Sequence, residues 1–227
     1  MKITDIKVYK LFSRSYLLRV LTDDGIEGIG QFISFNLNSQ ISYLSDTILP
    51  ILKGKDPINI DELWESMYWR GFGRNGWIQI IAAVDIALYD ILGKKLNIPL
   101  WKYFGSKNSH NINMYWSMGH GSKKTINQMT DDISKGIKMG FKGFKIRMDW
   151  HEYSQDKNPE KDFEMAKQVK LLIPKKSMFA FDANAGYSSK VAINQSQKLA
   201  SLNIDFFEEP VNTSNLFELK KVIKNSK

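Results

Sequence analysis

The chain of 227 residues contains no cysteine. Disulfide bridges, thiolate metal sites and cysteine nucleophiles are therefore excluded together. No stretch approaches the roughly 18 consecutive apolar residues that a membrane-spanning helix needs, so we expect no association with a membrane. The first residues, MKITDIKVYKLF, alternate apolar and polar side chains and lack the continuous apolar core of a signal peptide. These absences predict a cytoplasmic protein.

The chain has enough apolar material for a folded core. Hydrophobic residues make up 43% of the sequence and aromatic residues 12%, which is too much for a disordered chain. The formal net charge is +8, but the lysines are spread over most of the sequence, with one short cluster at Lys220, Lys221, Lys224 and Lys227. We interpret this cluster as the solvated face of a last helix, and we expect no nucleic-acid partner.

The N-terminal part of the chain predicts an α+β domain. Three segments of alternating polarity, the last two joined by the turn Asp23-Asp24-Gly25, are expected to form an antiparallel meander: 3–11, 16–22 and 27–32. Helices are expected at about 39–52, 56–68 and 78–96. The last of these, IQIIAAVDIALYDILGKKL, carries apolar side chains on more than one face and three small alanines, which predicts a closely packed, buried helix. We place this domain at residues 1–110.

From residue 111 short apolar runs alternate with amphipathic helical segments. The runs are 112–118, 143–148, 178–181 and 204–207, and the helical segments are about 125–139, 159–172, 188–202 and 214–225. Strand followed by helix, four times, is typical of βα units on a parallel sheet. Four units form either a small open sheet or half of a (β/α)8 barrel. Open strand edges would be a liability, so we expect residues 111–227 to be a partial barrel, truncated at the C-terminus.

Polar residues follow three of the apolar runs at the point where each strand is expected to end. They are Lys145 and Arg147 in GFKIRMDW, Asp182 and Asn184 in FAFDANAGYS, and Glu208 and Glu209 in IDFFEEP. In parallel barrels this end of the strands carries the chemistry. Neighbouring strands lie ~4.8 Å apart, so carboxylates on the third and fourth strands can converge on one cation. Oxygen ligands without Cys or His favour Mg²⁺ over zinc.

These motifs resemble those of the enolase superfamily, in particular the mandelate racemase group of the mandelate racemase/muconate lactonizing enzyme family. The segment AAVDIALYDILGKKLNIPLWKYFG resembles the passage from the family's capping domain into its barrel, and TDDGIEGIGQ resembles the capping meander. The resemblance covers essentially the whole chain. It implies an α/β protein in which an N-terminal α+β capping domain is followed by the first four βα units of a (β/α)8 TIM-like barrel.

The resemblance also implies roles for individual residues. Asp182 and Glu208 match the first two of three magnesium ligands, and the third would lie beyond this chain. Lys145 matches the first lysine of a family pair that binds and polarises the substrate carboxylate. Asn184 matches a position that approaches polar groups of the substrate.

Arg14 lies in the first turn of the capping domain, where the family sets its specificity.

The chemistry implied by the resemblance is removal of the proton α to the carboxylate of a small anionic hydroxy acid. Loss of a β-hydroxyl then gives a 2-keto-3-deoxy acid, whereas return of the proton gives an epimer. Arg147 departs from the family, whose second lysine is the usual base on one face of the substrate. A guanidinium with a pKa above ~12 is a poor base at neutral pH. We therefore favour a sugar-acid dehydratase, a lyase acting on aldonates or aldarates, over a racemase, epimerase or cycloisomerase.

Structural explanations remain open for each of these residues. Asp182 and Glu208 can cap the helices that follow them, and Asn184 can be a turn residue. Lys145 can form a salt bridge at the rim, and Arg147 can belong to a structural ion pair. Arg14 can be an ordinary exposed turn residue.

Two further expectations concern residues near the proposed site. Glu209 follows Glu208 on what we expect to be an extended strand end, so its side chain is expected to point the opposite way. None of the three histidines, His110, His120 and His151, matches a catalytic position of the family, although His120 follows the first barrel strand.

The last expectations concern the polypeptide as a whole. With two of three metal ligands, the 227-residue chain itself is expected to be inactive, which leaves a non-catalytic fragment or a binding remnant as the alternative of another class. A full-length protein is expected to be a homo-oligomer. The identity of the substrate does not follow from the sequence.

Overall fold

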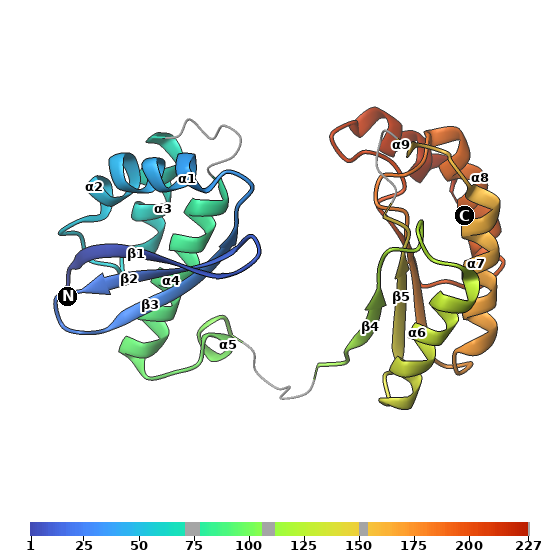
Figure 1. Ribbon diagram of the computed structural model, residues 1–227, viewed down its shortest axis with the longest axis horizontal. Helices are drawn as coiled ribbons and strands as arrows, with labels where there is room; N and C mark the ends of the chain where they lie inside the picture. Colours follow the sequence, from blue (N-terminus) through green and yellow to red (C-terminus); the bar gives the residue numbers. More distant parts are fainter. Residues whose placement is uncertain (71–77, 106–111, 150–153, 227) are drawn as a thin grey trace. The chain divides into compact units, whose positions relative to one another are not determined.

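The computed structural model describes residues 1–70, 78–105, 112–149 and 154–226. It divides the chain into two compact units, Met1–Ser109 and His110–Lys227 (Figure 1). The elements of the first unit are β1 (Ile3–Phe12), β2 (Ser15–Thr22), β3 (Glu27–Ile33), α1 (Leu37–Tyr43), the π-helical turn η1 (Leu44–Ile48), α2 (Leu49–Leu52), α3 (Ile60–Arg70), α4 (Ile78–Leu96) and α5 (Leu100–Tyr103). None of the described helices combines the length and apolar character needed to cross a membrane.

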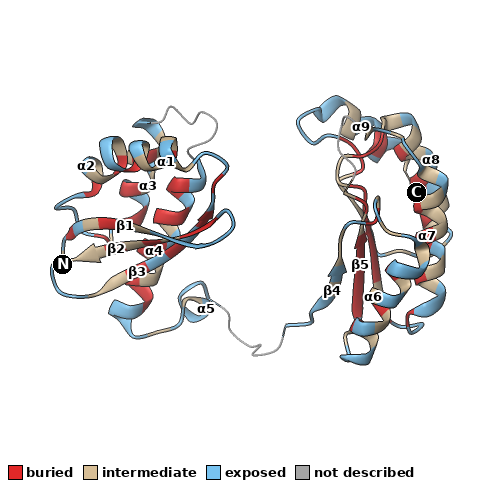
Figure 2. Ribbon diagram, in the orientation of Figure 1, coloured by how far each residue is buried: buried red, intermediate tan, exposed pale blue. Residues whose placement is uncertain are grey.

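The first unit is a three-stranded antiparallel meander with helices packed against it, as the alternating segments predict. β2 lies between β1 and β3. The buried core joins residues of the sheet, such as Leu18 and Val20, with one side of α4. Figure 2 shows this buried layer between the strands and the helices.

Two glycines of β3 set the distance between the sheet and α4. A Cβ atom at Gly28 would lie 1.9 Å from the carbonyl oxygen of Ala87, and one at Gly30 would lie 1.9 Å from the carbonyl oxygen of Ala83. Neither separation is physically possible, so only glycine permits this approach. Ala83 and Ala87 of α4 complete this close contact, whereas Ala82 and Ile86 are exposed, so the helix is buried on one side only.

The single helix expected at about 39–52 is interrupted in the structure. It forms α1 and α2 with the π-helical turn η1 between them, and Leu49 N–H donates to the carbonyl of Leu44 across this wider turn. Pro50 accounts for the interruption, because it has no N–H to donate and its ring crowds the carbonyl four residues earlier.

In its described residues, the second unit contains four strands, each followed by a helix. Its elements are β4 (Tyr115–Met118), α6 (Ile126–Lys138), β5 (Gly143–Arg147), α7 (Pro159–Leu172), β6 (Met178–Asp182), α8 (Ser189–Ala200), β7 (Phe206–Glu208) and α9 (Leu216–Asn225). All neighbouring strands are parallel, in the order β4-β5-β6-β7. This confirms the four βα units, which form half of an enolase-type α/β barrel. The first strand begins at Tyr115 instead of residue 112, and the side chains of Ile112 and Met114 before it are exposed.

Successive side chains of β5 and β6 point alternately to the two faces of the parallel sheet. One face packs against the helices, and the other carries Lys145. Phe144 and Ile146 of β5 join Phe179 and Phe181 of β6 in a buried cluster with α6 and α7. Helices α6, α7 and α8 lie along this face of the sheet (Figure 1). Because successive side chains of a strand point to opposite faces, Lys145 lies on the other side of the sheet from Phe144 and Ile146.

Candidate active site

Three polar residues of the second unit meet at one rim of the parallel sheet. Arg147 is paired in register with Asp182, and Asp182 is paired with Glu208. Each is the last residue of its strand, and the carboxyl ends of parallel strands lie at the same edge. Lys145 precedes Arg147 by two positions, so it projects from the same face of β5. The structure thus brings together four of the residues that the sequence motifs single out.

Lys145 connects the two carboxylates. Its Nζ lies 2.6 Å from Oε2 of Glu208 and 3.4 Å from Oδ2 of Asp182. Because one ammonium group is within reach of both carboxylates, the two acids are close enough to share a cation. The Asp182 side chain is 4% exposed and that of Glu208 is 41% exposed. Within the pair, the carboxylate of Asp182 is therefore shielded from water and that of Glu208 is accessible to it.

Burial and charge shift the pKa values of this group. Burial raises the pKa of Asp182, and the charge of Glu208 adds to the rise, while the backbone N–H of Asn184 and the charge of Lys145 oppose it. Burial alone would lower the pKa of Lys145, but its hydrogen bond to Glu208 and the charges of both carboxylates outweigh this, and the pKa lies above its ordinary value. Lys145 is therefore charged at neutral pH, and a further cation would relieve the crowded negative charge.

The carboxylate pair fits a hard divalent cation in its donor chemistry. Both groups offer oxygen ligands, and one of them is already removed from water, which suits Mg²⁺. In the described part of the chain, no group of three or more His, Cys, Asp or Glu side chains is placed to hold a metal ion. Asp182 and Glu208 therefore qualify as part of a magnesium site, and not as a complete one.

Asn184 lies in the turn directly after β6. Its backbone N–H donates a hydrogen bond of 2.8 Å to Oδ1 of Asp182, and its φ of 50° is in the left-handed region. The turn therefore orients the carboxylate of Asp182 through its backbone. This geometry fits the turn interpretation of Asn184 and leaves its role towards a substrate as a prediction.

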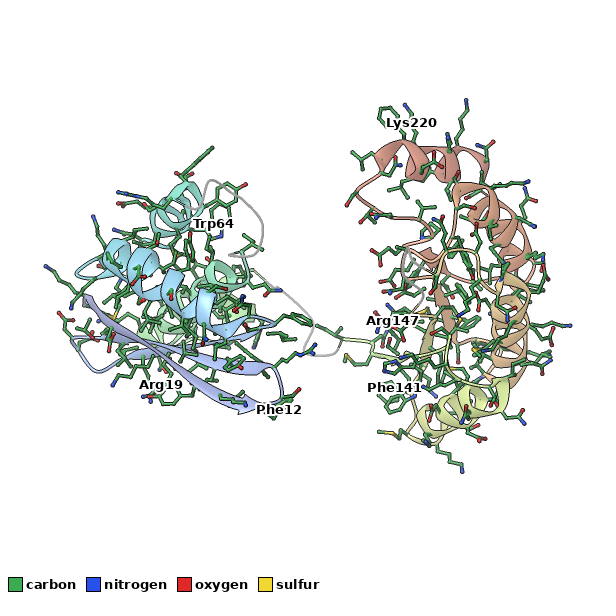
Figure 3. All side chains as sticks on the ribbon, turned by 45° about the horizontal axis from the view of Figure 1, so that its top comes forward. Phe12, Arg19, Trp64, Phe141, Arg147 and Lys220 are labelled. Atoms are coloured by element: carbon green, nitrogen blue, oxygen red, sulfur yellow. The ribbon has the colours of Figure 1, made fainter. Side chains whose placement is uncertain are left out.

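Arg147 forms an ion pair with Asp149, a residue that the sequence reasoning missed. One guanidinium nitrogen of Arg147 lies 2.6 Å from Oδ1 of Asp149, and the backbone N–H of His120 donates to Oδ2 of the same carboxylate. The His120 ring nitrogen Nδ1 lies 3.4 Å from Oδ2. Figure 3 labels Arg147 on the strand side of the second unit. The sequence places Arg147 and Asp149 two positions apart. Oppositely charged residues at this separation are too common to predict an ion pair.

Arg14 belongs to the first unit. Its guanidinium carbon lies 4.5 Å from the centre of the exposed Phe35 ring, a cation–π contact within one end of the meander. This contact accounts for its conformation, and a role in substrate binding stays a prediction. His110 and His151 lie outside the described residues.

The expected geometry of Glu209 is wrong in one respect. β7 ends at Glu208, and Glu209 has a φ of 43°, so its backbone is left-handed and not extended. Strand alternation therefore does not apply to its side chain. The contact between Lys145 and Glu208 is what distinguishes the two glutamates.

Comparison with known proteins assigns both units to one family. A model of the mandelate racemase/muconate lactonizing enzyme N-terminal domain matches residues 12–105, and a model of the enolase C-terminal domain-like family matches residues 128–226. The chain belongs to the mandelate racemase/muconate lactonizing enzyme family. For this family member, the matched regions contain β2 and β3 of the meander and all four residues of the rim.

Curated relatives of this family member are named sugar-acid dehydratases. The arabinonate dehydratase of Saccharolobus solfataricus is 34% identical over 200 residues, which cover 86% of this chain and 52% of that protein. A D-galactonate dehydratase family member of Marinomonas is 32% identical over 133 residues, which cover 57% of this chain and 32% of that protein. The chain thus spans about half or less of the length of these relatives.

A solved structure of the family matches the whole chain. The mandelate racemase/muconate lactonizing protein of Paracoccus denitrificans, complexed with magnesium, superposes with a TM-score of 0.90 at 26% identity. The match covers 100% of this chain and 63% of that protein. The matched portion holds the capping domain and half of the barrel.

Proposed function

We propose that the rim formed by Lys145, Asp182 and Glu208 is the first half of the active site of a Mg²⁺-dependent sugar-acid dehydratase. Such a lyase removes water from an aldonate or aldarate and yields a 2-keto-3-deoxy acid. The observation that carries the proposal is the position of one buried ammonium group between two carboxylates at the carboxyl end of a parallel sheet. The named activities of the relatives support dehydration at the level of the family.

Asp182 and Glu208 would hold the magnesium ion. When bound, magnesium supplies positive charge that stabilises the enediolate form of the substrate carboxylate. Lys145 is the second source of positive charge. Its ammonium group exchanges its contact with Glu208 for a hydrogen bond to a carboxylate oxygen of the substrate. That hydrogen bond strengthens as negative charge develops, so it favours the transition state over the bound substrate.

Dehydration requires one base and one departing hydroxyl. The base takes the proton from the carbon α to the carboxylate, and the electron pair forms the double bond as the β-hydroxyl leaves. The hydroxyl takes up a proton and departs as water, and the resulting enol rearranges to the keto acid. Arg147 is unsuited to be the base, because its guanidinium is protonated at neutral pH and paired with Asp149. We place the base on barrel strands that these residues do not include, and assign Arg147 an electrostatic role.

We further propose that the 227 residues turn over little or no substrate by themselves. Two carboxylates leave most of the coordination sphere of Mg²⁺ to water, and Arg147, at the position of the family's usual base, is a poor proton acceptor. Turnover by this chain at a rate comparable to that of a protein with a complete barrel would contradict this proposal.

Ion binding tests the assignment of the carboxylate pair. Mn²⁺ serves as a paramagnetic probe of the Mg²⁺ site, and it broadens the amide signals of residues near it even when binding is weak. We expect selective broadening at Asp182 and Glu208, and at least about tenfold weaker binding in Asp182→Asn, because the variant loses one charged ligand. Glu160→Gln is the matched control, since it removes one negative charge from an exposed position on α7. Equal affinities in the two variants would contradict the proposal.

Activity is tested with a polypeptide that joins these residues to the remaining barrel strands. A panel of aldonic and aldaric acids is incubated with Mg²⁺, and formation of a 2-keto acid is followed as a semicarbazone. A dehydratase produces keto acid from at least one member of the panel. Epimerisation without loss of water would instead support the racemase alternative.

A further inference from the structure

Tyr187 is a fully buried tyrosine close behind the rim. Its hydroxyl donates a hydrogen bond of 2.7 Å to Oδ2 of Asp162, which is itself buried. Asp162 lies in the first turn of α7, where the free N–H groups of a helix favour negative charge. A buried carboxylate is costly unless it is hydrogen-bonded. The hydroxyl of Tyr187 is therefore part of what allows a charge to lie inside this unit.

The turn that ends at Tyr187 is bonded to the segment that contains Glu208. Three amides of the turn donate to three successive carbonyls: Ala183 to Glu208 at 3.1 Å, Ala185 to Glu209 at 2.8 Å and Tyr187 to Pro210 at 3.2 Å. These bonds continue the pairing of β6 and β7 beyond the strands. The two segments that bear the carboxylates are thus joined along their length.

This region stores backbone strain next to the carboxylates. Asn184, Ala185 and Glu209 have φ values of 50°, 59° and 43°. The left-handed conformation is unfavourable for residues with a side chain, least so for Asn. Such conformations persist where the surrounding structure holds them. The turn therefore needs an anchor, and Tyr187 is its buried end.

The ring of Tyr187 also contacts Phe207, which in turn contacts Phe181. Its centroid lies 6.3 Å from that of Phe207, which lies 5.8 Å from that of Phe181. Phe207 is adjacent to Glu208, and Phe181 is adjacent to Asp182. A shift of the tyrosine ring would therefore be transmitted to both strand ends.

We propose that Tyr187 is a positioning residue for the carboxylate pair. Its hydroxyl, held by Asp162, fixes the turn at 183–187. The turn then sets the distance between the carboxylates of Asp182 and Glu208. The inference rests on the proposed function in assigning this pair to a divalent cation, whereas the anchoring of the turn does not depend on that assignment.

Amide hydrogen exchange tests the anchoring in the 227-residue chain. Tyr187→Phe keeps the ring and removes the hydroxyl. We expect the amides of Ala183 and Ala185 to exchange about tenfold faster, as expected for loss of a hydrogen bond to a charged group. Val169→Ala is the matched control, because it removes buried methyl groups of α7 without a bond to the turn. Equal exchange at the two amides in both variants would overturn the proposal.

Mn²⁺ titration of the same variants tests the effect on the carboxylate pair. We expect Tyr187→Phe to weaken Mn²⁺ binding about fivefold, which corresponds to a loss of roughly 1 kcal/mol in binding free energy. Val169→Ala should leave the affinity unchanged. Asp162→Asn keeps an oxygen acceptor for the hydroxyl but removes the charge, so it should weaken Mn²⁺ binding less than Tyr187→Phe does. The double variant of Tyr187→Phe with Asp162→Asn removes the buried charge as well, so it should regain stability but still bind Mn²⁺ weakly. A purely structural role predicts that affinity recovers together with stability.

The outcomes separate this inference from the proposed function. Absence of Mn²⁺ broadening at Asp182 in the unsubstituted chain would overturn the metal assignment, and hydrogen exchange would still decide whether Tyr187 anchors the turn. Normal Mn²⁺ binding in Tyr187→Phe, with faster exchange, would overturn the positioning role and leave the metal assignment intact.

Discussion

The ammonium group of Lys145 lies 2.6 Å from Oε2 of Glu208, although β6 separates the strands that carry them and 63 positions separate them in the chain. Lys145, whose register partner on β6 is Ala180, therefore reaches diagonally across β6 to contact the far carboxylate. The ammonium group of Lys145 thus forms ion pairs with both Asp182 and Glu208. The charge balance of the rim depends on it.

Lys145→Met should destabilise the chain by about 2 kcal/mol, because it leaves a desolvated and a half-exposed carboxylate without their cation. Added Mg²⁺ should restore part of this loss by replacing the missing charge. Urea unfolding followed by circular dichroism, with and without MgCl2, measures both effects. Lys198→Met, which breaks a pair with the exposed Glu160, is the control and should cost less than ~0.5 kcal/mol. A loss in Lys145→Met no greater than in the control would contradict the prediction.

Arg147→Lys should turn a side chain that cannot accept a proton into one that can. In the complete-barrel protein we expect dehydration to slow roughly tenfold, ~1.4 kcal/mol, because the charge-assisted hydrogen bond to Asp149 is weakened. The variant should also exchange the α-proton of unreacted substrate with solvent, which the parent does not do on this face. Mass spectrometry of substrate recovered from D2O measures this exchange. Deuterium uptake by the parent at the rate of the variant would exclude a purely electrostatic Arg147.

Tyr187 should make the stability of the chain fall at alkaline pH. Burial and the charge of Asp162 raise the pKa of Tyr187 far above its ordinary value of 10.0. Because the folded pKa is raised, the contribution is complete below about pH 10, where both states hold the proton. Above about pH 10 the unfolded chain releases the proton and the folded chain keeps it, so the free energy of unfolding falls by ~1.4 kcal/mol per pH unit.

The difference in stability between the parent chain and Tyr187→Phe should therefore shrink above about pH 10. Guanidinium unfolding of both proteins across this range measures it, and other tyrosines cancel in the comparison. A difference that stays constant with pH would show that Tyr187 ionises normally in the folded chain.

Gly28→Ala should disrupt the first unit. A methyl group there meets the carbonyl of Ala87, and overpacking of this kind costs roughly 1–3 kcal/mol. Thermal unfolding measures the loss. Ile29→Ala is the control, because Ile29 lies on the opposite, exposed face of β3 and should change stability by no more than about 0.5 kcal/mol. Equal unfolding temperatures for the two variants would contradict the close approach of α4.

Local patterns in the sequence were sufficient to predict the strands and to place polar residues at the strand ends. Alternation in β1, β2 and β3 and the apolar runs of the second unit each depend on neighbours within a few positions, so their periods can be read along the chain. Asp182 follows the apolar run 178–181 and Glu208 follows Phe206 and Phe207, which places both at the strand ends. The single helix expected at about 39–52 was wrong, because Pro50 and the π-helical turn before it interrupt the helix.

Contacts between distant residues were decided only by folding. Lys145 bonds to Glu208 because the register of three parallel strands places their ends side by side, and no pattern along the chain encodes a bond over that separation. In the sequence, Asp149 and Asp162 are ordinary loop and helix carboxylates. Only the packed structure pairs Asp149 with Arg147 and Asp162 with Tyr187. Burial is a property of the packed molecule, and burial determines which of the acids in this chain are costly to charge and therefore able to attract a cation.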